Sequence, residues 1–581
     1  MKDNKEIQEK LFQIQQTPIS EELQISSFHP VVKQIYANRG VKEVKEVDYR
    51  LRFLDHFSLL SDMETAVERL VKARPDEKVF VVGDYDVDGA CAISIMVLGL
   101  EGLGFARPQF LIPDRVKDGY GVTIGICPKI IESGATLVIT VDNGISGHEA
   151  IENLSKKGID VIVLDHHLPS QEKGLPPAYA IVNPQKGHDA FPSKSLCGAG
   201  VAFYTLMALK ERLIANGVLI ERNSFNLYNL LEYVALATIA DVVPLDTNNR
   251  ILTSYGLKII QQGKGCHGIR AALHEAGKEY RNTSSADLAF SLAPLINASG
   301  RLRSMKEGIK CLLSSTQEEA KSHAKALKQL LNERKKLEGE MLIAANLQIK
   351  EMSGGEKDSL PGVIVLYQEN WHLGIIGLLA SNIVNSTRRP AVVFTSSGGG
   401  LLRGSVRSVS EVNISGIFGK VVAKNPDLII SYGGHHMAAG LAIREEKLEE
   451  FSAAVRSEVE EHYSFKEFSE RMLIDGELDE DDLSEEFFHE LDNAGPWGPG
   501  FPEPFFKGHF RVINKKVVAG CHIILTLAYK SIRIQGILFY ADRFGVLNND
   551  LDAVEIIYRL SMNSYQGKRY IQLIINKIVS H

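Results

Sequence analysis

The chain of 581 residues is poor in cysteine and has no long apolar run. Its six cysteines share no paired spacing, which argues against a disulfide framework and leaves no CxxC pair for a structural zinc site. We therefore expect reduced, buried thiols at Cys91, Cys127, Cys197, Cys266, Cys311 and Cys521. The first residues lack an apolar stretch, and no run of about 18 uncharged apolar residues occurs anywhere. The sequence thus predicts a cytoplasmic protein without a membrane segment.

An excess of basic charge is also missing, since the formal net charge is −7. Phosphate binding needs a basic face, so this value argues against an extended nucleic-acid surface. Much of the acid, however, stands in the stretch GELDEDDLSEEFFHELDN that begins at Gly476 and in the motifs described next, so Lys and Arg remain to line a groove. The length predicts roughly three or four domains, each with its own core.

Three acidic motifs stand in the first half of the chain: GDYDVDG from Gly83, VDNG from Val141 and VLDHHLP from Val163. Each follows a short β-branched run (KVFVV, TLVITV, IDVIVL), which predicts a buried parallel strand. Open α/β sheets keep their active sites at the carboxyl ends of such strands. A fourth acid, Asp241, ends the apolar segment that begins at Leu231, where an unpaired carboxylate would cost several kcal/mol.

These motifs predict a metal cluster. Carboxylates that share one cleft repel one another, and divalent cations neutralise them while gaining oxygen and nitrogen ligands. Mixed carboxylate and imidazole ligation suits Mn²⁺ or Mg²⁺, and two ions about 3.5 to 4 Å apart suit in-line displacement at phosphorus. The candidate side chains are Asp84, Asp86, Asp88, Asp142, Asp165, His166, His167 and Asp241.

A DxDxDG segment alone is also typical of a turn or a calcium loop. An EF-hand would need a glutamate within the apolar run ACAISIMVLGL that follows Gly89, and the run contains none. Gly198 and Gly200 open a predicted helix, where backbone N–H groups would face a phosphate or the glycines would serve close packing.

The second half of the chain changes pattern three times. From Ser314 to Met352, apolar residues recur at helical spacing after Ser315 and Thr316, which pair with Glu318 or Glu319 as capping boxes; such a helix would span on the order of 50 Å. A second α/β pattern from Pro361 contains SYGGHHMAAG, in which Gly433, Gly434 and His435 suit an anionic ligand. Short alternating segments then predict a small C-terminal barrel.

Arginines and aromatic residues raise the question of a substrate. Arg115, Arg301, Arg403 and Arg407 offer forks that bind phosphate, although a pairing with surface acids is the alternative for Arg115 and Arg403. Among the aromatic residues of the barrel, six either stack on bases or fill the core, and the sequence assigns none of them: Phe505, Phe506, Phe510, Tyr529, Phe539 and Tyr540.

In order and spacing, the four acidic motifs resemble those of the DHH phosphoesterase superfamily. Four further elements are similar to those of its RecJ single-strand-specific exonucleases, and the likeness runs from about residue 50 to the end: PDRVKDGYG from Pro113, NASGR from Asn297, WHLGIIG from Trp371 and SYGGHHMAAG from Ser431.

The resemblance implies an α/β fold in which a DHH-type doubly wound parallel-sheet domain is joined by a long helix to a second α/β, DHH-associated domain, followed by an OB-fold β-barrel. The expected boundaries are a peripheral N-terminal helical segment at 1–50, the catalytic domain at 51–310, the connecting helix at 311–352, the DHH-associated substrate-binding domain at 353–465 and the nucleic-acid-binding barrel at 466–581.

The resemblance further implies a metal-dependent exonuclease of DNA repair and recombination that degrades single-stranded DNA from the 5′ end to nucleoside 5′-monophosphates. Two Mn²⁺ or Mg²⁺ ions would be held by Asp84, Asp86, Asp88, Asp142, His166 and Asp241, with the ligating subset of the first three left open. His167 would contact the scissile phosphate, and Asp165 would orient His166 or the cluster. The 5′ phosphate would be held by Arg115, Arg301, Ser405 and Arg407, and the strand by the motif of Gly433, Gly434 and His435.

Expected partners are single-stranded DNA, a single-stranded-DNA-binding protein and a recombination helicase, and the enzyme is expected to be a monomer. Two other functions use the same residues. A DHH phosphodiesterase or pyrophosphatase for small substrates would not need the long helix and the barrel. A catalytically silent DNA-binding relative would have lost motif acids, whereas every acid is present here.

Overall fold

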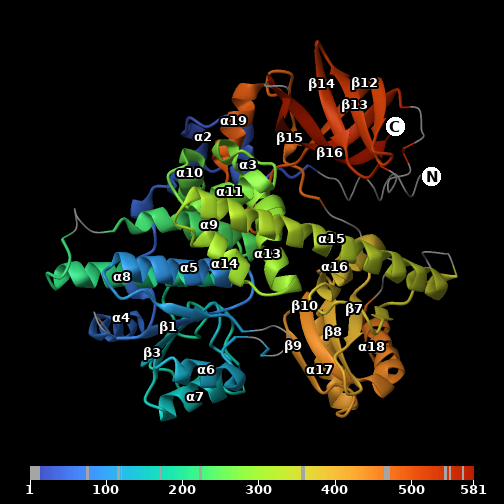
Figure 1. The fold of residues 1–581 in the computed structure, drawn as a ribbon. Helices are drawn as coiled ribbons and strands as arrows, with labels where there is room; N and C mark the ends of the chain where they lie inside the picture. Colours follow the sequence, from blue (N-terminus) through green and yellow to red (C-terminus); the bar gives the residue numbers. More distant parts are fainter. Residues whose placement is uncertain are drawn as a thin grey trace.

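The computed structural model describes residues 14–73, 77–113, 118–119, 121–170, 172–220, 225–354, 360–463, 472–541, 546–547, 551–565 and 568–580. Figure 1 shows a first α/β domain, a second α/β domain beside it and a β-barrel above, with the long helix α15 (Gln317–Ser353) crossing from the first domain to the second. Within these residues, no helix combines the length and the apolar character that crossing a membrane requires.

The first domain is built on a parallel five-stranded sheet in the order β2-β1-β3-β4-β5. Along β1, Val79 and Val81 pack toward one core, whereas Phe80 and Val82 pack toward a second core on the other face. This alternation explains why helices cover both faces, and it confirms the predicted doubly wound architecture. The strands are β1 (Val79–Gly83), β2 (Gln109–Leu111), β3 (Leu137–Val141), β4 (Asp160–Leu164) and β5 (Ala180–Val182).

One face of this sheet is covered by α4 (Met63–Lys72), α5 (Val87–Gly102) and α8 (Gly198–Ala215), and the other by α6 (Cys127–Glu132) and α7 (His148–Lys156). Helix α5 is apolar on all sides because it lies between the sheet and the neighbouring helices α8 and α9. A further helical layer comprises α9 (Leu231–Ala240), α10 (Thr247–Gln262), α11 (His267–Glu275), α12 (Ser285–Asp287), α13 (Ala293–Leu302) and α14 (Lys306–Leu312).

The N-terminal segment contains α2 (Glu21–Ile25) and α3 (Pro30–Asn38). The sequence pattern indicated a peripheral segment, but α3 is part of the main core. Val32, Ile35 and Tyr36 lie on one helical face and are at most 2% exposed. The expectation of a peripheral position is therefore wrong for this helix.

Helix α15 (Gln317–Ser353) has 37 residues and is about 55 Å long. The side chain of Thr316 accepts the Glu319 N–H at its start, and the Glu319 carboxylate accepts the Ser315 N–H, so capping residues from both predicted pairs take part. Its first half, with Ala324, packs into the first domain, and its second half, with Ala345, packs into the second. One helix therefore contributes to two cores.

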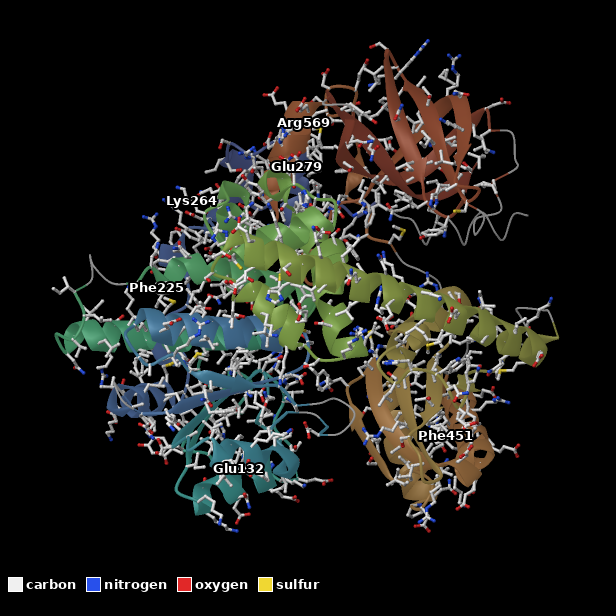
Figure 2. The ribbon with its side chains drawn as sticks, in the orientation of Figure 1. Glu132, Phe225, Lys264, Glu279, Phe451 and Arg569 are labelled. Atoms are coloured by element: carbon white, nitrogen blue, oxygen red, sulfur yellow. The ribbon has the colours of Figure 1, made fainter. Side chains whose placement is uncertain are left out.

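The second domain has a mixed sheet in the order β6-β7-β8-β10-β9, in which only β6 and β7 are parallel. Phe451 of α18 is fully buried against Phe394 and Phe418 in its core (Figure 2). The elements are β6 (Ile364–Tyr367), α16 (Ile376–Thr387), β7 (Ala391–Ser396), β8 (Leu401–Arg407), α17 (Ile414–Lys424), β9 (Ser431–Gly434), β10 (Ala438–Arg444) and α18 (Leu448–His462).

The C-terminal strands form a closed barrel, as predicted. The order β12-β13-β14-β16-β15 closes through the pairing of β12 with β15, and β14 and β16 are its parallel pair. Arg569 donates to Asn282 Oδ1 at 3.3 Å where the barrel meets the first domain (Figure 2). The elements are β11 (Gly476–Glu477), α19 (Glu485–Ala494), β12 (Phe506–Val518), β13 (His522–Tyr529), β14 (Ile532–Leu538), β15 (Ala553–Tyr565) and β16 (Lys568–Ser580).

The barrel separates the aromatic residues that the sequence left unassigned. Phe506 and Phe510 are buried in the barrel core, and Phe505 and Tyr529 are partly buried. Phe539 and Tyr540 are 45% and 51% exposed and follow the last residue of β14.

The six cysteines are free, four of them buried and Cys266 and Cys521 partly buried. None of the six forms a disulfide, and the expected burial is found for four of them but is incomplete for Cys266 and Cys521.

Candidate active site

The strands β1, β3 and β4 end level with one another. Gly83 pairs with Val141, and Val141 pairs with Leu164. The next residue along each strand is therefore brought to the same edge, and these residues are Asp84, Asp142 and Asp165. Asp142 has a positive φ of 59°, a conformation that aspartate and asparagine tolerate better than most residues.

The first motif turns from β1 directly into α5. Asp86 is the N-cap of α5, and its side chain accepts the Gly89 N–H at 3.1 Å. Asp88 lies in the first turn, and its two oxygens accept the N–H groups of Gly198 and Ala199, each at 2.7 Å. These N–H groups at the start of α8 therefore bind a protein carboxylate, which decides against the phosphate interpretation of this helix start.

Close packing also requires Gly198. A Cβ atom at this position would lie 2.6 Å from the Cβ of Asp142. Any larger residue would push the α8 N-terminus away from Asp88 and Asp142 together.

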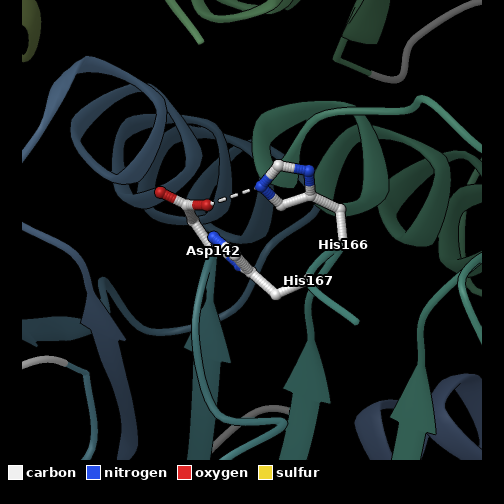
Figure 3. Close-up of side chains that lie close together, drawn as sticks. All are labelled: Asp142, His166 and His167. Carbon is white, nitrogen blue, oxygen red and sulfur yellow. Dashed lines mark hydrogen bonds and ion pairs between the residues drawn. The ribbon is translucent and has the colours of Figure 1, made fainter. Parts of the chain in front are cut away.

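The acids and His166 form one cluster. His166 Nε2 lies 3.1 Å from Asp142 Oδ1 and 3.7 Å from Asp241 Oδ2, and Figure 3 shows the first of these contacts. Asp88 Oδ2 is also 3.7 Å from this nitrogen. Ligand atoms lie within 4.8 Å of one another in three overlapping sets: Asp84, Asp86 and Asp142; Asp88, His166 and Asp241; and Asp142, His166 and His167.

The pKa values of the cluster show that its carboxylates are buried and repel one another. Burial and neighbouring carboxylates raise the pKa of Asp142 and of Asp241 well above the ordinary range, and they raise that of Asp88 to about 7. Burial lowers the pKa of His166 to about 4, so its imidazole is neutral and able to ligate. A donor set of several buried carboxylates and a neutral imidazole fits divalent cations that accept oxygen and nitrogen ligands.

Asp165 binds the ring of His167, whereas Asp142 binds the ring of His166. Asp165 is fully buried and accepts the Nδ1–H of His167 at 2.8 Å. Its oxygens also accept the backbone N–H groups of Ile145, His166 and His167. The sequence predicted that Asp165 orients His166 or the cluster. The structure differs, because the side-chain contact is with the ring of His167 and His166 reaches Asp165 through its backbone N–H.

Asp165 and His167 shift each other's pKa in opposite directions. Burial favours the neutral form of each, but their hydrogen bond and charges outweigh it. The pKa of Asp165 falls to about 2, and that of His167 rises to about 9. The two side chains are therefore an ion pair beside the cluster.

Cationic and hydroxyl groups of both α/β domains lie at the turn that opens α16, with Arg301 on α13 of the first domain and Ser405 and Arg407 on β8 of the second. Arg301 Nη1 lies 3.5 Å from the carbonyl oxygen of Gly374. A Cβ at Gly377 would lie 3.0 Å from Ser405 Oγ and 3.4 Å from Arg407 Nη2. Three of the four residues expected to hold a 5′ phosphate thus contact one helix N-terminus, which itself attracts anions. The fourth, Arg115, lies outside the described residues.

The glycines of this turn were not singled out from the sequence, although the motif WHLGIIG contains both. A Cβ at Gly374 would lie only 1.9 Å from the carbonyl oxygen of Arg301. This close approach is the physical signal that sets Gly374 apart.

Asn143 was likewise passed over within VDNG. It is fully buried, and its amide donates to the carbonyl groups of Val82 and Val141 while its side-chain oxygen accepts the Val122 N–H. It therefore ties together the ends of β1 and β3.

Gly433 and Gly434 end β9 at the exposed edge of the second sheet, and His435 directly follows this strand. Gly434 has φ +147°, and a Cβ there would lie 2.4 Å from the Ala438 carbonyl oxygen, so glycine is required. The charge of His435 contributes to the low pKa of His166, after burial and His167. His435 of the second domain is therefore close enough to His166 to act on it electrostatically.

Comparison with known proteins gives matches along the chain. Models of three families match it: the DHH family N-terminal domain at residues 78–238, the DHHA1 domain at 360–461 and the RecJ OB domain at 474–577. The single-stranded-DNA-specific exonuclease RecJ of Dickeya dadantii is 37% identical over 97% of this chain and 99% of that protein.

Solved structures agree with these matches. The structure of RecJ in complex with Mn²⁺ from Thermus thermophilus matches with a TM-score of 0.79 and 28% identity, over 98% of this chain and 79% of that one. The Mg²⁺ complex from the same organism matches with a TM-score of 0.71 and 25% identity, over 98% of this chain and 78% of that one.

Proposed function

The chain belongs to the RecJ family of single-stranded-DNA-specific exonucleases, and from this premise we propose that it removes nucleotides from the 5′ end of single-stranded DNA and releases nucleoside 5′-monophosphates. It is a metal-dependent phosphodiesterase whose cofactor is Mn²⁺ or Mg²⁺. The observation that carries the proposal is that carboxylates and a neutral imidazole form one cluster beside the carboxyl ends of β1, β3 and β4, whose last residues pair with one another.

The proposed metal ligands are Asp84, Asp86, Asp88, Asp142, His166 and Asp241. Bound cations would acidify a water molecule and neutralise charge at the phosphorus under attack. Asp88 has a second duty, since its oxygens also hold the start of α8. This supports a rigid position for Asp88 relative to Asp142.

His167 is the proposed catalytic group that contacts the scissile phosphate. Its ion pair with Asp165 keeps the imidazole protonated and fixes the direction of its ring, so it presents positive charge and an N–H donor. Developing negative charge on a phosphate oxygen would be stabilised by such a preorganised donor. Asp165 acts through His167 and is a positioning residue.

The 5′ end of the strand is proposed to sit at the N-terminus of α16. Arg301, Ser405 and Arg407 surround this turn and suit a phosphate monoester, and Arg115 is kept in the proposal from the sequence. The strand would then pass Gly433, Gly434 and His435 on its way to the metal cluster. Recognition of the terminal phosphate at a fixed distance from the metals would set the length of the released product.

The C-terminal barrel is proposed to bind the strand beyond the cleavage site. Phe539 and Tyr540 are the exposed aromatic residues that support base stacking there, and the ring of His522 contacts both at centroid distances of 5.4 and 5.0 Å. The proposed domain division is the N-terminal segment at 1–50, catalytic domain at 51–310, helix at 311–352, substrate-binding domain at 353–465 and barrel at 466–581.

The proposal extends to the cellular role. We infer a monomeric cytoplasmic enzyme of DNA repair and recombination that works beside a single-stranded-DNA-binding protein and a recombination helicase. The family assignment supports this role, because these partners generate and cover the single strands that such an enzyme degrades.

The test uses a single-stranded oligonucleotide labelled at its 3′ end, with Mn²⁺ and an EDTA control. Stepwise shortening with the label retained, together with mononucleotide products, is the expected result. Hydrolysis of dinucleotides without shortening of the oligonucleotide would move the chain to the small-substrate phosphodiesterases. Efficient digestion of a blunt duplex would contradict single-strand selectivity.

A further inference from the structure

A tight loop from the C-terminal part of the chain lies against the segment that follows Asp241. The Leu245 N–H donates to the Pro499 carbonyl at 2.7 Å, and a Cβ at Gly498 would lie 2.9 Å from Leu245 Cδ1. Residues 242–245 thus have a close-packed neighbour that is about 250 positions away in the sequence.

The loop at 497–501 is itself well defined. Gly498 and Phe501 exchange two backbone hydrogen bonds at 3.0 and 3.1 Å. The rings of Trp497 and Phe501 are stacked, with centroids 5.2 Å apart and an interplanar angle of 9°. A loop with paired backbone groups and stacked rings is a rigid support for whatever it contacts.

The segment between Asp241 and Leu245 is also held from the other side. Asn249 donates its side-chain amide to the Pro244 carbonyl at 2.9 Å. Arg250 donates to the Leu245 carbonyl at 2.8 Å, and its guanidinium lies 4.3 Å from the centre of the Phe501 ring. Arg250 therefore binds both the segment after Asp241 and the loop at 497–501.

Asp241 depends on this support because its own backbone is at the end of regular structure. It is the C-cap of α9, and the next residue, Val242, has a positive φ of 59° and is 64% exposed. A β-branched residue in this conformation is strained and persists only when the surrounding structure imposes it. The contacts on Leu245 supply that constraint within four residues of the carboxylate.

The same loop is anchored to the barrel. Arg39 forms a buried two-pronged pair with Asp475 at 2.6 and 3.0 Å. Its guanidinium lies 5.3 Å from the centre of the Trp497 ring, and its Nε donates to the carbonyl of Pro502, the residue after the loop, at 2.7 Å. Asp475 exchanges hydrogen bonds with the backbone of Phe505, directly before β12. The start of β12, the loop and the segment after Asp241 are thus joined by direct contacts.

We propose that the loop at 497–501 positions Asp241, and that Trp497 is the positioning residue through which the placement of the barrel is coupled to the metal cluster. The proposal rests on the proposed function, because it takes Asp241 as a metal ligand. Groups that orient metal ligands typically change metal affinity about 10- to 100-fold when they are removed. The effect of the loop should therefore be visible in metal binding without DNA.

The experiment is a calorimetric titration of the full chain with Mn²⁺ in the absence of DNA. Asp241→Asn first identifies the binding step that uses this carboxylate. Trp497→Ala is expected to weaken that step about 10-fold or more, and Trp497→Phe, which retains a ring beside Phe501, to restore it. Leu560→Ala truncates the barrel core without touching the loop and is the matched control, expected to bind Mn²⁺ as the wild type does.

Wild-type Mn²⁺ affinity in a folded Trp497→Ala protein would overturn the proposal, and so would an equal loss in Leu560→Ala. Should Trp497→Ala fail to fold, the Mn²⁺ titration is repeated with Gly498→Ala, whose new methyl group displaces the Leu245 side chain. This variant is expected to weaken the same binding step, and an unchanged affinity would overturn the proposal. The nuclease assay on the wild type tests the proposed function separately, so the two failures are distinguishable.

Discussion

His167 donates its Nδ1–H to Asp165 at 2.8 Å, and Asp165 is itself fixed by three backbone N–H groups. The ring is therefore oriented before any substrate arrives. His167→Ala is expected to lower kcat about 100- to 1,000-fold, the usual effect of losing one preorganised donor to a developing anion. Single-turnover cleavage of an oligonucleotide measures this loss. Mn²⁺ affinity should stay unchanged, and a large loss of affinity would make His167 a metal ligand instead.

Asp142→Asn is expected to abolish turnover while stabilising the metal-free protein. Burial and the nearby carboxylates raise the pKa of Asp142, so removing its charge relieves repulsion, and asparagine accepts the positive φ. The gain should be roughly 0.5 to 2 kcal/mol, the usual range for a stabilising substitution. Urea unfolding in EDTA measures it. Mn²⁺ should stabilise the wild type more than the variant, and a variant less stable in EDTA would contradict the repulsion argument.

Arg407→Ala is expected to remove a preference for 5′-phosphorylated over 5′-hydroxyl oligonucleotides. Hydrogen bonds to a charged group are worth about 1.5 to 3 kcal/mol, which corresponds to roughly 10- to 100-fold in kcat/KM. Arg444→Ala, an exposed arginine at the end of β10 in the same sheet, is the matched control. Equal loss on both oligonucleotides would mean that Arg407 holds the strand elsewhere than at its end.

Glu232→Gln is expected to flatten the pH dependence of stability. Burial raises the pKa of Glu232 to about 8, well above its ordinary 4.5. Between these values the folded chain holds a proton that the unfolded chain releases, so this contribution is complete below pH 4.5 and is lost as the pH rises through 8. The variant should be more stable than the wild type at pH 9, by a few kcal/mol, and equally stable at pH 4. Calorimetry measures this, with exposed Glu211→Gln as the control.

Phe539→Ala is expected to weaken binding of single-stranded DNA. Stacking of one base on an aromatic ring is worth about 1 to 3 kcal/mol, or roughly 5- to 100-fold in Kd. Fluorescence anisotropy with an oligothymidylate in EDTA measures binding without cleavage. Val517→Ala truncates an apolar side chain of similar exposure on β12 and should have no effect. An unchanged Kd for Phe539→Ala would place the DNA path on another face of the barrel.

Most of the first domain could be predicted from local sequence patterns. Each acidic motif directly follows a β-branched strand, so the position of Asp84, Asp142 and Asp165 at one sheet edge follows from strand polarity alone. The separation of two cores by alternating residues in β1 is predictable for the same reason. These features depend on neighbours in the sequence, and they are the ones the pattern expresses.

Contacts between distant segments could not be read in this way. Nothing near Gly198 indicates that its N–H meets Asp88, and nothing near Leu245 indicates Pro499. The ring that Asp165 contacts was also missed: the sequence predicted that Asp165 orients His166 or the cluster, whereas its contact with His167 depends on the direction in which the two adjacent rings point. Such pairings are set by packing, which a local pattern does not record.

The two halves of α15 belong to different hydrophobic cores, and no residue between Leu331 and Met341 is buried. The helix therefore couples the distance between the two domains to their rotation about its axis. One inserted residue in this stretch would advance the far half by about 1.5 Å and also turn it by about 100°. Such a turn would swing Arg407 and His435 away from the metals, whereas a loop of equal length would absorb the insertion. The distance between the two functional surfaces is thus set by counting residues along a helix.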